Sequence, residues 1–186
     1  ISGIASDDEL NVYPIDDYAE PRVGTTPDEA AWNALPDGLN ATWASRDEHY
    51  KLHDVPQVTQ KNEATLHAWK GERANIQAVL YSKNDQGMLS VRMTEWKKNG
   101  KATGVNGGDA RFVNYVITDD YVSCGNHPMT LPQWLVADVI DQNKPHAVPA
   151  METRPVWCTV EIPRDIEAGE YTTALEVVNA DGNVVK

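Results

Sequence analysis

A chain of 186 residues, 41% of them hydrophobic, is long enough for one domain with a substantial core and too short for two full domains. The formal net charge of −12 argues against nucleic acid and anionic membranes as partners, because an acidic surface repels phosphate groups. No apolar run could span a bilayer, and the first residues lack the pattern of a signal peptide. We therefore expect an exported protein, periplasmic, cell-surface or extracellular, whose signal peptide has been removed.

Residues 1–40 are polar and show no sustained hydrophobic period, so we expect an irregular N-terminal segment. A short helix is predicted within it over residues 26–35. Thr26 is the candidate N-cap of this helix, and Glu29 follows three residues later, which is the capping-box spacing. Residues 42–54 fit either a second short helix or an extended entry into the first strand, and the pattern does not separate the two.

Apolar residues alternate from about residue 63 onward, which predicts β-strands. The alternating stretches are residues 64–82 with a break at Gly71, 88–96, 111–120, 155–163 and 170–178. Glycine and asparagine mark residues 99–110 as a loop. Residues 124–150 contain four prolines and are predicted to be mostly loop, with one short helix near Trp134–Ile140 as an option.

Two local signals near the C-terminus are typical of β-sandwiches. Gly169 and Tyr171 stand at the start of the last long strand, where a tyrosine often hydrogen-bonds back across a corner. Asp181 and Gly182 predict a two-residue hairpin turn, and its returning arm ends at Lys186. So short an arm would leave its neighbour's edge unpaired, so we expect the natural chain to continue.

These elements together predict an all-β fold. We expect a two-layer antiparallel β-sandwich, Ig-like or jelly-roll-like, over residues 41–186, with residues 1–40 as an irregular extension. Such a module needs no cofactor, and no nucleotide-binding or nucleophile motif occurs in the chain. We assign no catalytic residue and no cofactor.

The cysteines and acidic residues give no clear site. Cys158 falls on the apolar side of a predicted strand, which favours a buried free thiol, and a disulfide with Cys124 is the alternative. Asp119 and Asp120 end a predicted strand and could contribute oxygen ligands to calcium, but a solvated loop is the favoured interpretation. We therefore predict no metal site.

Tryptophan is the most informative residue type. Exposed aromatic rings stack on the apolar faces of sugars, so exposed tryptophans are candidates for glycan binding. Three of the six tryptophans fall on strand faces opposite the aliphatic side, and a fourth lies in the long loop. These candidates are Trp69, Trp96, Trp157 and Trp134. The alternative is that they pack against a neighbouring domain.

Three stretches, in this order, resemble the N-terminal β-sandwich domain of glycoside hydrolase family 123. They are "LHAWKGERANIQAVLYS", "WLVADVID" and "RPVWCTVEIPRDIEAGEYTTALEV". Trp157, Pro163, Gly169 and Tyr171 match the family pattern, whereas Thr173 stands where a second glycine is usual. The resemblance covers roughly residues 41–186.

The resemblance implies an exported bacterial β-N-acetylgalactosaminidase. In that family a catalytic (β/α)-barrel follows the sandwich, where an adjacent Asp-Glu pair supports catalysis assisted by the substrate's own acetamido group. The barrel would lie beyond Lys186, so this chain would be a non-catalytic accessory domain that packs on the barrel. The alternatives are a stand-alone carbohydrate-binding module and a cell-surface adhesion or scaffold domain.

Overall fold

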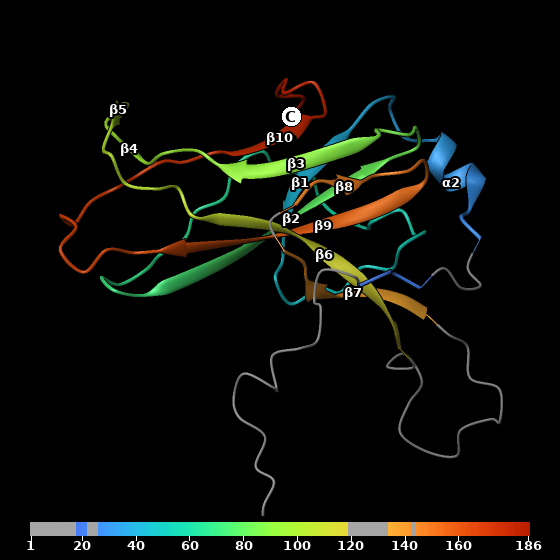
Figure 1. Cartoon of the computed structure of the whole chain (residues 1–186), viewed down its shortest axis with the longest axis horizontal. Helices are drawn as coiled ribbons and strands as arrows, with labels where there is room; N and C mark the ends of the chain where they lie inside the picture. The colour runs from blue at the N-terminus through green and yellow to red at the C-terminus, as the bar shows by residue number, and fades with distance from the viewer. Residues whose placement is uncertain (1–17, 22–25, 119–133, 143) are drawn as a thin grey trace, which may run out of the picture.

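The computed structural model describes residues 18–21, 26–118, 134–142 and 144–186 (Figure 1). Almost all regular structure in these ranges is β, which confirms the predicted all-β fold. The elements are α2 (Glu29–Asn33), β1 (Asn40–Ala44), β2 (Arg73–Ser82), β3 (Met88–Met93), β4 (Lys97–Lys98), β5 (Lys101–Ala102), β6 (Asp109–Thr118), β7 (Trp134–Ile140), β8 (His146–Ala147), β9 (Glu152–Glu161) and β10 (Leu175–Asn179).

The strands form two layers of antiparallel sheet and a small hairpin. The larger sheet has the order β1-β2-β9-β6-β7, and the smaller one has the order β10-β3-β8. Figure 1 shows β3 and β10 lying together on one side of the larger sheet, with the β4–β5 hairpin projecting from the end of this layer. In the centre of the larger sheet, β2 and β9 pair along their full length, with Ile76 opposite Cys158.

The core between the two sheets is built from alternate residues of the long strands. The buried residues of this core are Ala78, Leu80, Leu89, Val91, Ala110, Phe112, Val148, Val156, Cys158 and Val177. The period-two pattern of the sequence predicts this face, because successive side chains of a strand point to opposite sides. The stretches 73–82, 88–93 and 155–161 therefore lie in strands as predicted.

The outer face of the larger sheet is also covered. Trp32 of α2 is fully buried and packs with Tyr50, Val79 and Tyr81. Leu52 packs beside them in a second cluster with Tyr115. Helix α2 and residues 50–58 therefore act as a third layer, and β2 is buried on both faces from Gln77 to Ser82.

The predicted helix is present, but its cap differs from the prediction. Helix α2 begins at Glu29, and the carboxylate of Asp28 accepts hydrogen bonds from the backbone N–H groups of Ala30 and Ala31 at 3.0 and 3.2 Å. Asp28 rather than Thr26 is therefore the N-cap, and the helix is one turn long.

The prediction of a short helix near Trp134–Ile140 is wrong, because these residues form strand β7. Strand β7 pairs with β6 from Thr118↔Trp134 to Val113↔Ile140, with a bulge between Asn114 and Tyr115. Its other edge is covered by residues 50–52, since Leu52 N–H donates to the Leu135 carbonyl at 3.1 Å. Residues 42–44 belong to β1, Lys51 bridges to Val136, and turns join them, so residues 42–54 hold no helix, which resolves the alternative that the sequence left open.

The prediction of strand structure over residues 64–82 is wrong for its first residues. Residues 64–69 form no strand, and Leu66 and Trp69 are exposed there. The break at Gly71 is real, because this residue adopts φ of +78°, which favours glycine. Strand β2 begins only at Arg73.

The tyrosine signal is confirmed, and a hairpin is present, but its loop has three residues, 180–182, rather than the predicted two, since the Asn179 N–H donates to the Asn183 carbonyl at 3.0 Å. The Tyr171 hydroxyl donates to the carbonyl of Glu167 at 2.8 Å across the corner. The hairpin turn closes where the Gly182 N–H donates to the Asn179 carbonyl at 3.0 Å. The returning arm pairs with β10, since Val185 N–H donates to the Val177 carbonyl at 2.8 Å.

The loop after β5 packs closely against the backbone at the end of β3, and a substitution at Gly107 tests this packing. An added Cβ at Gly107 would lie 1.8 Å from the backbone oxygen of Thr94, so the backbone itself would have to shift. We expect Gly107→Ala to lower the free energy of unfolding by at least about 3 kcal/mol in urea denaturation. Gly38→Ala is the control, since its Cβ meets open space and only its φ of +86° is unfavourable, for a cost of about 1 kcal/mol. Equal losses in the two variants would contradict the steric argument.

Candidate functional site

The structure places the four candidate tryptophans in different environments. Trp96 is 5% exposed, and its Nε1–H donates to the Gly107 carbonyl at 3.0 Å. Trp157 is half-buried against the cluster around Leu52. Trp134 is half-buried, with the ammonium of Lys51 3.7 Å from its ring centroid. Trp69, in contrast, is 84% exposed, so its ring is the one of the four that is open to a ligand.

The turn that carries Trp69 is fixed by hydrogen bonds. The Trp69 backbone N–H donates to the Glu72 carboxylate at 2.6 Å, and the Glu72 N–H donates to the Trp69 carbonyl at 3.1 Å. Gly71 N–H donates to the carbonyl of Ile162 at 2.9 Å, and Ile162 N–H donates to the Glu72 carbonyl at 2.8 Å. The turn is therefore attached to the end of β9.

A groove of about 450 Å³ lies beside this turn. Its lining contains two arginines and two glutamates, and the residues are Gly71, Glu72, Arg73, Glu161, Ile162, Pro163 and Arg164. The Nε–H of Arg73 donates to Glu161 at 3.1 Å, and both side chains of this pair remain well exposed. The groove therefore offers hydrogen-bond donors and acceptors to solvent.

A second groove, of about 580 Å³, runs along the outer face of β3 and β10 and is mostly apolar. It is lined by Met88, Ser90, Val91, Arg92, Pro145, Val178, Asn179, Ala180 and Gly182. Met88 is 46% exposed, and Val184 of the neighbouring C-terminal arm is 51% exposed. This face therefore presents apolar side chains where a sandwich normally presents polar ones.

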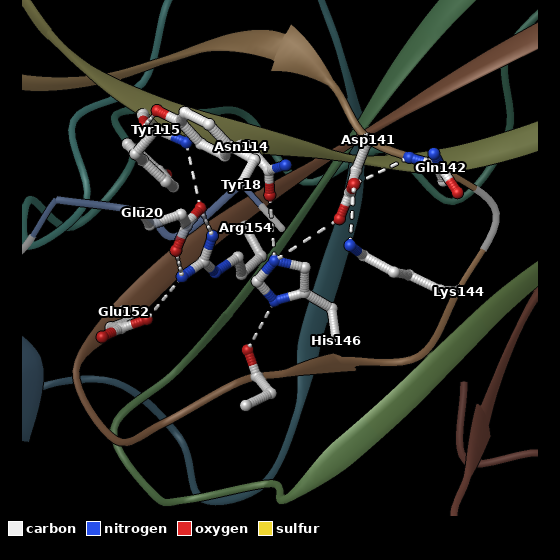
Figure 2. A network of polar contacts seen from close by, with 11 residues as sticks. Tyr18, Glu20, Asn114, Tyr115, Asp141, Gln142, Lys144, His146, Glu152 and Arg154 are labelled. Atoms are coloured by element: carbon white, nitrogen blue, oxygen red, sulfur yellow. Dashed lines mark hydrogen bonds and ion pairs between the residues drawn. The ribbon is translucent and has the colours of Figure 1, made fainter. Parts of the chain in front are cut away.

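The strongest electrostatic feature is a buried charge network at one end of the larger sheet (Figure 2). The Arg154 side chain is fully buried. Its guanidinium donates two hydrogen bonds to the Glu20 carboxylate, one of them 2.7 Å long, and a third to Glu152 at 3.0 Å. The guanidinium also lies 5.0 Å from the ring centroid of Tyr115. Charges taken out of water need such partners, because an isolated buried charge is very costly.

The network fastens residues 18–20 to β6. Glu20 accepts a hydrogen bond from the Tyr115 backbone N–H at 2.9 Å, and the Tyr18 hydroxyl donates to the Tyr115 carbonyl at 2.7 Å. Burial alone would lower the pKa of Arg154, but the hydrogen bonds and charge of Glu20 outweigh burial and raise that pKa. Arg154 therefore stays charged at every accessible pH.

A neighbouring polar group joins β6 to the smaller sheet (Figure 2). His146 Nε2 lies 3.0 Å from the Asn114 side-chain oxygen and 3.9 Å from the carboxylate of Asp141. Lys144 lies 3.4 Å from the same carboxylate. The carboxylates of Glu20, Glu152 and Asp141 are at most 8% exposed and all lie beside basic groups. Such an arrangement suits a fold-stabilising role, because carboxylates that cleave glycosides must reach the scissile bond.

Sequence reasoning missed this network, although one signal was visible. Arg154 has the same parity along β9 as Val156 and Cys158, so an arginine stands on a core-facing position. Such a residue requires a buried acidic partner, but the sequence does not say that this partner is Glu20, 134 positions away.

Cys158 is a buried free thiol, as the strand pattern favours. Burial, and secondly the charge of Asp109, raise its pKa to about 12. Cys124 and the pair Asp119–Asp120 lie outside the described residues. Within the described ranges, no group of three or more His, Cys, Asp or Glu side chains is placed to hold a metal ion. Nor does any helix there have the length and apolar composition needed to cross a membrane.

Comparison with known proteins identifies the domain. Residues 43–179 match the family model described as the glycoside hydrolase 123 N-terminal domain. The chain belongs to this family. Its fold is similar to a solved structure described as a family 123 glycoside hydrolase from Clostridium perfringens, with a TM-score of 0.63 and 18% sequence identity. That match covers 77% of this chain and 25% of the solved one, so this chain spans a quarter of the relative. A search of curated proteins found no match.

We expect the stability of this domain to depend strongly on Arg154. We expect Arg154→Ala to lower the free energy of unfolding by about 3–5 kcal/mol, because two buried carboxylates lose their counter-charge. Arg73→Ala is the matched control: its pair with Glu161 is exposed, so the loss should stay within about 1 kcal/mol. Urea denaturation of both variants measures the difference, and similar small losses would contradict the assigned role.

Protonation of Glu20 in acid should also lower the stability of the domain. Burial alone would raise the pKa of Glu20, but the hydrogen bonds and charge of Arg154 outweigh burial and hold that pKa below its ordinary value of 4.5. The stabilisation is therefore complete above about pH 4.5 and is lost as pH falls through the lower, folded-state pKa. Thermal unfolding followed by circular dichroism should show a steep fall of Tm below that pH.

Glu20→Gln should have a lower Tm at neutral pH and a shallower fall in acid, because the titrating group is gone. Glu161→Gln, which changes an exposed carboxylate, should keep the steep acid profile of the unmodified chain. An unchanged profile in Glu20→Gln would show that Glu20 does not control the acid transition.

Proposed function

We propose that this chain is the non-catalytic N-terminal domain of an exported glycoside hydrolase that acts on N-acetylhexosamine-containing glycans. The observation that carries the proposal is the family match over residues 43–179. The solved relative, whose structural description concerns glycolipid glycan hydrolysis, is four times as long as the matched region, so other domains accompany this fold there. In the proposed protein, this domain packs on a catalytic (β/α)-barrel and supports it.

The placement of the acidic residues favours a structural role for this domain over a catalytic one. A glycosidase needs two carboxyl groups on either side of the scissile bond, in a cleft that admits the sugar. Among the described carboxylates, Glu20 and Glu152 are buried and share Arg154. Two further glutamates line the open groove beside Trp69, and both have structural partners: Glu161 pairs with Arg73, and the Glu72 carboxylate accepts a hydrogen bond from the Trp69 backbone N–H.

The apolar groove along β3 and β10 supports packing on a second domain. Met88 and Val184 expose about half of their surface on this face. Removing such apolar surface from water favours the packing of another domain against it. The C-terminal arm pairs along the edge of β10, and Gly182 of its turn lines the groove (Figure 1). A catalytic domain that follows this arm would be within reach of the groove.

The proposal predicts where the activity lies. The complete polypeptide that contains this chain should release nitrophenolate from p-nitrophenyl β-N-acetylgalactosaminide, whereas residues 1–186 alone should release none. The matched β-galactoside, which lacks the acetamido group, is the control substrate and should not be cleaved. Activity in residues 1–186, or a complete polypeptide that cleaves no β-N-acetylhexosaminide, would contradict the proposal.

A further inference from the structure

We propose that the Trp69–Glu72 turn and its adjoining groove bind a pyranose ring of a glycan, with the indole of Trp69 as the stacking platform. The ligand class rests on the proposed function, since a domain of a glycan-cleaving enzyme meets sugars at high local concentration. The site itself rests on the exposure, rigidity and polar lining of this part of the molecule.

Exposure is the first argument. Trp69 is 84% exposed, whereas Trp32 and Trp96 are buried in the same fold. Leaving so large an apolar ring in water forgoes the gain of burying it. A sugar covers one face of such a ring, because the C–H groups on one side of a pyranose are apolar while its hydroxyls remain in water.

Rigidity is the second argument. The hydrogen bonds from Trp69 to Glu72 and from Gly71 to Ile162 fix the turn against β9. The Arg164 side chain closes over Gly71, where an added Cβ would lie 3.0 Å from the Arg164 Cγ. A turn whose backbone is already ordered loses little conformational entropy when a ligand binds.

The groove supplies the third argument. Its two arginines and two glutamates carry no net charge together, although the whole chain carries −12. Sugar hydroxyls both donate and accept hydrogen bonds, and the groove offers both kinds of partner. A neutral, hydroxyl-rich ring therefore suits this groove better than an anion or a cation does.

The same features argue against a protein partner at this turn. The core of a protein interface is depleted of charged residues, whereas the exposed run around Trp69 includes Lys61, Glu63 and Lys70. Its large exposed apolar side chains are Trp69 and the half-exposed Leu66, which offer far less area than a stable interface buries. The β3–β10 groove, whose lining is mostly apolar, is the surface that better fits a protein partner.

Nuclear magnetic resonance tests the site directly, because each of the six tryptophans gives its own indole N–H signal. Trp69→Phe identifies the Trp69 signal by its disappearance. Methyl β-N-acetylgalactosaminide is then titrated into the unmodified chain to about 50 mM, since one stacked ring gives at best millimolar affinity. We expect a saturable shift of the Trp69 signal and no saturable shift of the other described indoles.

Two variants complete the test. Trp69→Ala should weaken binding at least about tenfold, and its preserved spectrum would show that the exposed position tolerates the change. Leu66→Ala, a matched exposed apolar residue of the same segment, should bind like the unmodified chain.

The site is overturned if no indole signal shifts saturably, or if Trp69→Ala binds unchanged. It is also overturned if the Trp69 signal changes only in the complete polypeptide without sugar, which would indicate a contact between domains. A complete polypeptide that hydrolyses its substrate while Trp69 stays unaffected would leave the proposed function intact. Conversely, a sugar-dependent Trp69 shift with no hydrolysis in the complete polypeptide would keep the site and overturn the proposed function.

Discussion

The buried guanidinium of Arg154 is the constraint on which one end of the sandwich depends. A fully buried positive charge in a strand tolerates few arrangements, because each hydrogen bond must be directed and the charge must be balanced. Glu20 and Glu152 supply the balance, and Glu20 also binds the backbone N–H of Tyr115. The Glu20 side chain thus joins β9 and β6, and it holds residues 18–21 against the larger sheet.

Coverage of both faces of the larger sheet determines which surfaces remain for function. The smaller sheet covers one face, and helix α2 with residues 50–58 covers the other, through Trp32, Tyr50 and Leu52. Two open apolar features among the described residues are the β3–β10 groove and the single ring of Trp69. The two surfaces differ in composition, since the groove is mostly apolar whereas Trp69 is surrounded by charged side chains. We therefore assign a protein contact to the first and a sugar contact to the second.

The sequence predicts the parts of this fold that follow a local rule. Strands β2, β3 and β9 were predictable from period-two alternation, and the Tyr171 corner from its spacing to Gly169. Strand β7 was not, because prolines on both sides suggest a loop and a bulge interrupts its pairing. The Glu20–Arg154 pair was hidden for another reason: it joins residues that only the folded chain brings together. For the candidate site, the sequence named Trp69 but could not separate it from the tryptophans that the fold covers.

Hydroxyl-radical footprinting of residues 1–186 and of the complete polypeptide tests the central claim, that this is a supporting domain docked through β3 and β10. The account predicts that Met88 is oxidised more slowly in the complete polypeptide. Ile117, which is about as exposed as Met88 in the isolated chain, should react equally in both, and Trp69 should also stay accessible. Equal oxidation of Met88 in both proteins would contradict docking through this face.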